Sequence, residues 1–106
     1  MNKKMDSQKN DTIKTLLRQS ARWVMASNQD RNPIIALQHA NFGVGYLSAL
    51  RDIATDEEIE AVSGVNVQKF KNEIIKEQSA ITKHVMKLCP KNGPKVQLAN
   101  NKEELN

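Results

Sequence analysis

The stretch from residue 33 to residue 54 restricts the possible folds of this chain more than any other segment. Written as a helix, it carries apolar side chains around most of its circumference. Such a helix normally lies at the centre of a domain and packs against more than one neighbour. Asn32 followed by Pro33 marks its start, as an N-cap and a proline at the first helical position. Its two apolar rows consist of Ile35, His39, Phe42, Tyr46, Ala49 and Ile53, and of Ala36, Ala40, Gly43, Leu47, Leu50 and Ala54.

The rest of the chain predicts three more helices. After Asp11, a possible N-cap, apolar residues at helical spacing indicate a helix over about residues 11–27. Thr55 and Glu58 form a capping-box pattern that opens a short helix over about residues 56–62. Asn66 can cap a third long helix over about residues 66–89, which Pro90 ends. We expect its core residues to be Val67, Phe70, Ile74, Ile81, Val85 and Leu88, with Glu77 and His84 in apolar positions of the same heptad.

These patterns predict an all-α fold, a compact bundle of three long helices with one short connecting helix and flexible polar termini. We expect a single helical domain over residues 10–90, an N-terminal tail over residues 1–9 and a C-terminal tail over residues 91–106. The aromatic content of 4%, with four glycines and three prolines, argues against a β-sandwich or barrel.

The chain also carries signals about its cellular setting. Its one cysteine excludes an intramolecular disulfide framework. The longest nearly apolar stretch, residues 42–50, is too short to span a membrane, and the polar start shows no signal peptide. We therefore expect a cytoplasmic protein in a reducing compartment, with no membrane association.

Two neighbouring helices cannot cover all of the apolar surface of the 33–54 helix. Self-association would bury the remainder, so we expect a homo-oligomer, most simply a dimer, or a complex with another helical protein. Small residues at positions 36, 40, 43 and 45 would let another backbone approach closely, and the alternative is a kink at Gly43-Val44-Gly45. The residues that we expect at the interface are Trp23, Phe42, Gly43, Tyr46 and Leu50.

The segment from Asp56 to Ile74 suggests a different function. Ile59, the Gly64-Val65 turn, the Asn66 cap and Phe70 resemble the helix-turn-helix of DNA-binding proteins. The resemblance implies that Val67, Gln68, Lys71 and Asn72 face the major groove, with phosphate contacts from Lys3, Lys4, Lys14, Arg18 and Arg22.

Charge and packing oppose this second interpretation. The chain as a whole has a net charge of +4, but residues 55–79 hold three basic and six acidic residues, a net charge of −3 that repels phosphates. Glu60 also stands where the motif usually has a small residue. Nucleic-acid binding is therefore our alternative hypothesis, and assembly is the first.

Catalytic and metal-binding patterns are weak. Antiparallel pairing of the second and third long helices could bring His39 near His84 and Glu77, but these residues lack a recognised ligand spacing. They are weak metal candidates, and we expect no bound metal and no cofactor. The sequence contains no phosphate-binding glycine loop and no nucleophile elbow, so we do not expect an enzyme.

Overall fold

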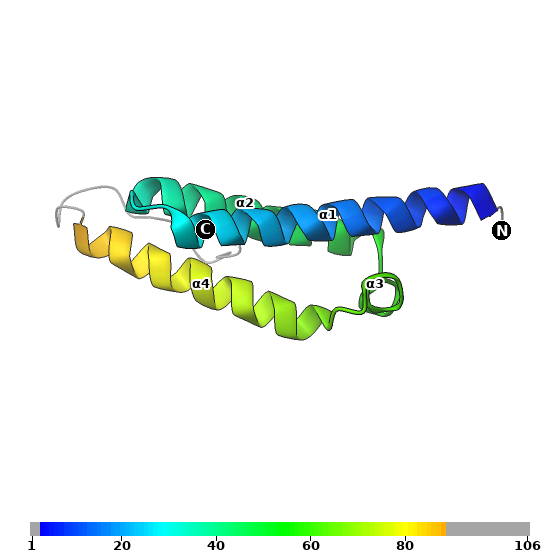
Figure 1. Ribbon diagram of the computed structural model, residues 1–106. Coiled ribbons are helices and arrows are strands. Elements are labelled where there is room, and N and C mark those ends of the chain that lie inside the picture. The colour runs from blue at the N-terminus through cyan, green and yellow to red at the C-terminus, as the bar shows by residue number, and fades with distance from the viewer. Residues whose placement is uncertain (1–2, 89–106) are drawn as a thin grey trace, which may run out of the picture.

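The computed structural model describes residues 3–88 as four helices joined by short connections (Figure 1). They are α1 (Lys3–Gln29), α2 (Pro33–Ile53), α3 (Asp56–Ser63) and α4 (Val67–Leu88). No strand occurs in this part of the chain, and the predicted all-α fold of three long helices and one short connecting helix is confirmed. The predicted C-terminal tail and the helix end at Cys89 lie outside the described residues.

The first helix begins eight residues earlier than the sequence pattern indicates. Asp11 lies inside α1 and does not cap it, and most of the predicted N-terminal tail is helical. Residues 6–12 are exposed, so their lack of apolar periodicity reflects a solvated helix surface and not an irregular segment. Lys9 is held by an ion pair to Glu58 of α3, with 2.6 Å between Nζ and Oε2. This contact, which apolar periodicity could not reveal, attaches the early part of α1 to the rest of the fold.

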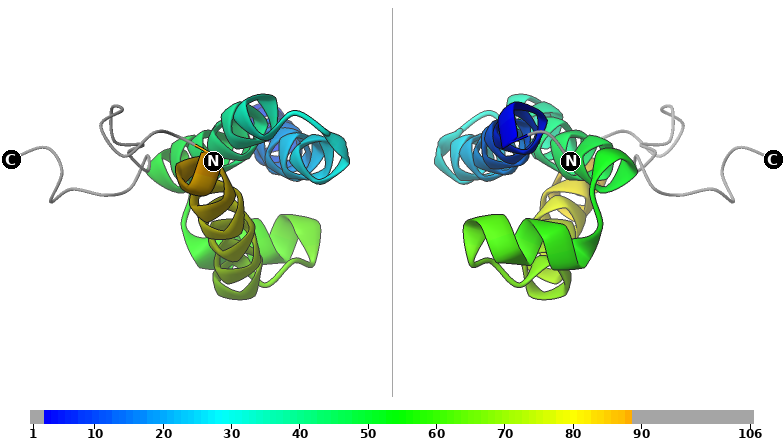
Figure 2. Two further views of the ribbon diagram at one scale, coloured as in Figure 1. Left: turned by 90° about the vertical axis from the view of Figure 1, so that its left-hand side faces the viewer. Right: turned by 90° about the vertical axis from the view of Figure 1, so that its right-hand side faces the viewer.

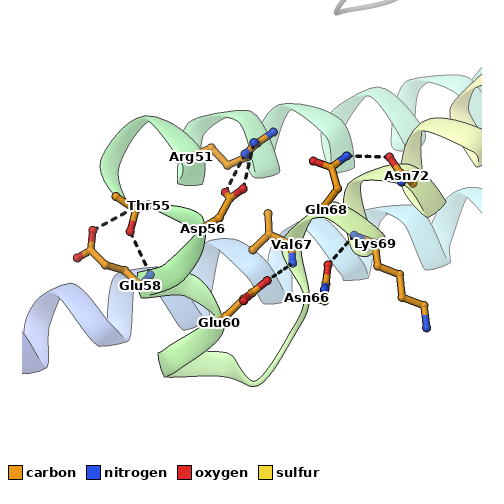
Figure 3. A network of polar contacts seen from close by, with 10 residues as sticks. All are labelled: Arg51, Thr55, Asp56, Glu58, Glu60, Asn66, Val67, Gln68, Lys69 and Asn72. Carbon is orange, nitrogen blue, oxygen red and sulfur yellow. Dashed lines mark hydrogen bonds and ion pairs between the residues drawn. The ribbon is translucent and has the colours of Figure 1, made fainter.

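The caps of α2 and α3 are those that the sequence predicts. The Asn32 side chain accepts hydrogen bonds from the backbone N–H groups of Ile34 and Ile35. The Thr55 hydroxyl accepts from the Glu58 N–H, and the Glu58 carboxylate accepts from the Thr55 N–H, both at 3.1 Å (Figure 3). Gly64 ends α3 with a positive φ of 74°, a conformation that glycine adopts without steric cost.

The start of α4 has two side-chain caps. The Asn66 side chain accepts from the Lys69 N–H at 2.9 Å, as predicted. Glu60 of α3 reaches across the turn and accepts from the Val67 N–H at 3.3 Å (Figure 3). The carboxylate at this position therefore connects α3 to α4, which explains why a larger polar residue occupies it.

The second helix is central, as predicted. It packs against α1 along one side and against α4 along another, while α3 contacts both α1 and α4. Both views of Figure 2 place α4 and α3 on the same side of the α1–α2 pair. The buried apolar core consists of Ile13, Leu17, Val44, Leu47, Leu50, Ala54, Ile59, Val67 and Ile74.

The buried face of α4 differs in part from the prediction. Val67, Ile74 and Val85 are buried as expected, but Leu88 is 61% exposed and His84 is exposed. Gln78 and Thr82 are buried instead, which moves the buried stripe by one residue from the predicted positions of Glu77 and Ile81. Polar bonds make this possible, because the Gln78 amide donates to Asn41 Oδ1 of α2 at 2.7 Å and the Thr82 hydroxyl donates to the Gln78 carbonyl.

Candidate interaction surface

One face of α2 points away from both α1 and α4 and contains mostly apolar residues. Ile35 is 39% exposed, Phe42 42% and Ile53 47%, and Gly45 and Ala49 lie between them on the exposed side. Figure 2 shows that, among the described residues, no helix covers the side of the α1–α2 pair opposite to α4. We call the set Ile35, Gln38, Phe42, Gly45, Ala49 and Ile53 the outer face of α2.

The outer face itself has no charged residue, and charged side chains occur in α2 only in its last turn, at Arg51 and Asp52. From Asn32 to Leu50 the sequence contains no lysine, arginine, aspartate or glutamate. A solvent-facing helix surface normally carries charged side chains, and an uncharged, mostly apolar one is typical of surfaces that contact another molecule.

An open, mainly apolar groove runs beside the outer face, between α1 and α2, with a volume of about 470 Å³. Because α1 lies next to α2 here, the groove extends the apolar surface across both helices. Trp23 packs edge-on against Phe42 at a centroid distance of 5.3 Å, and its buried Nε1 has no hydrogen-bond partner among the described residues. The groove is lined by Leu16, Trp23, Asn41, Phe42, Gly45, Tyr46 and Ala49.

His39 completes this aromatic cluster. Its ring lies 5.0 Å from Trp23 and 6.3 Å from Phe42 between centroids. Its Nδ1 atom pairs with the carboxylate of Asp30, in the connection between α1 and α2. The histidine thus fixes the end of the aromatic cluster to the backbone turn that precedes α2.

Of the five residues that the sequence predicts for an interface, three line the groove and two are buried in the monomer. Trp23, Phe42 and Tyr46 line the groove, but Gly43 and Leu50 are buried inside the monomer. A Cβ atom on Gly43 would lie 2.5 Å from Val24 Cγ2, and the Gly43 carbonyl accepts from the Ser20 hydroxyl at 2.6 Å. The small-residue strip therefore does allow close packing, as expected, but against α1 of the same chain. α2 runs without interruption through residues 43–45, so the helix does not break there.

The weak metal candidates do not come together. His39 pairs with Asp30 beside Trp23, whereas Glu77 and His84 line a hollow between the α1–α2 connection and α4 that Asp30 also borders but His39 does not line. No group of three or more histidine, cysteine, aspartate or glutamate side chains within the described part of the chain could hold a metal ion.

The residues implied by the helix-turn-helix resemblance are only partly exposed. Val67 is fully buried, so its side chain cannot contact a base. Gln68 and Asn72 are exposed, but the Gln68 amide donates to Asn72 Oδ1 at 3.0 Å, and Lys71 is half-buried (Figure 3). Asp56 pairs with Arg51 nearby, and the acidic Glu57 and Glu60 are exposed on the preceding helix.

Glu58 belongs to this acidic segment, and its pKa is lowered. The hydrogen bond from Lys9, and then that from the Thr55 backbone N–H, lower the pKa of the Glu58 carboxyl below its ordinary value of 4.5. Both hydrogen bonds favour the charged carboxylate, which is why the pKa falls. The same two bonds also fix the position of α3 in the fold.

The predicted interface set omitted Ile35, Gly45, Ala49 and Ile53, which the structure leaves exposed. The signal that could have found three of them is the division of α2 into two apolar rows, because the structure buries every member of the row of Ala36, Gly43 and Leu50 and no member of the row of Ile35, Phe42 and Ile53. Residues 32–50 carry no charged side chain in a chain of which 26% is charged, and a small domain can cover only some sides of such a segment.

Comparisons with known proteins add no further information. No protein-family model, curated protein or solved structure matches the chain. Among residues 3–88, none of the helices is both long and apolar enough to cross a membrane.

Proposed function

We propose that this chain is a small helical assembly module that binds a second copy of itself through the outer face of α2 and the adjoining groove. The observation that carries the proposal is the exposure of Ile35, Phe42 and Ile53 on a helix face without charged residues. Water-exposed apolar surface of this kind is stabilised when a partner covers it, at about 25 cal/mol per Å².

The estimated size of the surface is at the small end for a dimer interface and requires both helices of the layer. With 21 residues, α2 is about 32 Å long. A layer of two packed helices is about 20 Å wide, so the α1–α2 layer offers a footprint of about 600 Å² per copy. A stable interface buries about 800 Å² per partner, which α2 alone would not approach. The groove residues of α1, Leu16 and Trp23, therefore belong to the proposed interface.

The module acts by assembly and not by catalysis. Polar side chains that might serve chemistry are engaged within the fold: Ser20 bonds to Gly43, and Thr55, Glu58 and Glu60 cap helices. We also propose an intracellular, reducing setting, because one cysteine cannot provide an intramolecular disulfide. DNA binding is the less favoured proposal, since Val67 is buried and the surrounding segment is acidic.

Sedimentation of the full chain tests the proposal. The wild type should sediment as a dimer, and Phe42→Ala should dissociate it. Loss of two anchors, one per copy at about 2 kcal/mol each, would raise the Kd about a thousandfold. Met86→Ala is the matched control, because Met86 is 53% exposed on α4, away from the outer face, and should leave the dimer intact.

A wild-type chain that stays monomeric at high micromolar concentration would overturn the proposal. So would a dimer that Phe42→Ala and Met86→Ala weaken equally. Circular dichroism of each variant shows whether the helices are retained, so that loss of assembly is distinguished from unfolding. A salt titration with random duplex DNA tests the alternative, which fails if the chain does not bind at low salt.

A further inference from the structure

We infer that the two copies pair their α2 helices in antiparallel orientation, about a two-fold axis that passes between Gly45 and Tyr46. The inference rests on the proposed self-association and adds the orientation and register of the partner.

The outer face of α2 has a raised part and a hollow part. Phe42 projects from its N-terminal half with 42% of its surface exposed. Gly45 and Ala49 are exposed in its C-terminal half, and a Cβ atom on Gly45 would meet nothing within 4 Å. All three residues line the same groove, so the bulky ring stands directly beside the space left by the small residues.

An antiparallel pairing matches the raised part of one copy to the hollow part of the other. With the axis between residues 45 and 46, Phe42 faces Ala49 of the second copy and Gly45 faces Tyr46 of the second copy. Two-fold symmetry repeats both contacts. A parallel pairing would instead set Phe42 against Phe42 and Gly45 against Gly45, leaving voids that close packing disfavours. The antiparallel helix dipoles also attract each other.

The monomer gives no packing reason for Gly45. Glycine inside a helix is less stable than alanine, and Gly43 compensates for this by its contact with α1. Gly45 has no such contact, although it lies on the same helix two residues away. A second copy supplies the missing reason, because the absence of a side chain at Gly45 leaves room for Tyr46 of the second copy.

Cysteine crosslinking distinguishes the two orientations. In a Cys89→Ser background, the full chain would carry Gln38→Cys, Ile53→Cys or both. Gln38 and Ile53 are exposed on the outer face and lie about 22 Å apart along the helix, too far for a bond within one chain. In the inferred register, Gln38 faces Ile53 of the second copy. Lys76→Cys, on the exposed side of α4, measures crosslinking by random collision.

With a short bismaleimide, the double variant should give a covalent dimer. Each single variant should give no more covalent dimer than Lys76→Cys does. Efficient crosslinking of both single variants would show a parallel pairing and overturn the inference while leaving the proposed function intact. If the chain sediments as a dimer but no variant crosslinks, the inferred register is wrong, and the proposed function is still supported. If all variants and the wild type sediment as monomers, the proposed function and the inference both fail.

Discussion

Replacing Gly43 with alanine should destabilise the monomer, although alanine is the better helix former. The new Cβ would lie 2.5 Å from Val24 Cγ2, 3.0 Å from the Ser20 carbonyl oxygen and 3.3 Å from the Val24 backbone nitrogen. Two of these three neighbours are backbone atoms of α1. Relief of the contact therefore requires α1 to move away from α2, and a side-chain rotation is not enough.

The magnitude follows from three contributions. Alanine stabilises the helix by about 1 kcal/mol relative to glycine. Overpacking at a tight site costs about 1–3 kcal/mol. Movement of α1 also stretches the 2.6 Å bond from the buried Ser20 hydroxyl to the Gly43 carbonyl, and a buried polar group left without a partner costs about 1–3 kcal/mol. The net loss is about 3 kcal/mol, which lowers the Tm by about 12–24 °C in a chain of this size.

Gly45→Ala is the matched control, since its Cβ would meet nothing within 4 Å and its helix should gain about 1 kcal/mol. Urea unfolding followed by circular dichroism measures both variants, at a concentration where sedimentation shows monomers. The two variants should therefore shift the unfolding midpoint in opposite directions. If Gly43→Ala is as stable as Gly45→Ala, then α1 and α2 do not approach each other through Gly43, and the close packing described above is incorrect.

Three further predictions concern the polar contacts. Thr55→Ala removes the hydroxyl that accepts from Glu58 N–H and should lower the free energy of unfolding by about 1 kcal/mol in urea; no change would mean that the capping box contributes nothing. Because the pKa of Glu58 is lowered in the fold, its carboxylate stabilises the protein above about pH 5, and this contribution disappears as the pH falls through the lowered pKa. Glu58→Gln should thus flatten an acid titration followed by circular dichroism, and an unchanged curve would contradict the role of Lys9. Asn41→Ala leaves the buried Gln78 amide unpaired and should cost about 1–3 kcal/mol in urea unfolding, whereas Asn41→Leu with Gln78→Leu should be nearly neutral; equal losses would refute the pairing.

Local capping chemistry was predictable because each cap depends on a few adjacent residues. Asn32-Pro33, the Thr55–Glu58 box and the turn at Gly64 all placed helix ends to within a residue or two. The start of α1 was not predictable in this way. Its early residues are exposed and carry no apolar pattern, and the ion pair from Lys9 to Glu58 joins positions far apart in the sequence.

Apolar periodicity also could not decide which of two adjacent polar residues is buried, because the answer depends on a hydrogen-bond partner on another helix. It favoured Glu77 as a member of the apolar row, but Gln78 is the buried residue because Asn41 of α2 accepts from its amide. The same limit applied to the glycines. Gly43 and Gly45 are equivalent in composition, and only the position of α1 shows that one is enclosed and the other open.

The difference between these glycines bears on the candidate surface as a whole. Gly43, Leu47 and Leu50 are required by the monomer, because α1 and the rest of the core enclose them. Ile35, Gly45 and Ala49 are not, since exposed charged or helix-forming residues at these positions would leave the core contacts unchanged. The stability of a single copy therefore accounts for one side of α2 and leaves the composition of the other side unexplained. The inferred antiparallel second copy would account for it, because the pairing would bury Phe42 and set Tyr46 of the second copy opposite Gly45.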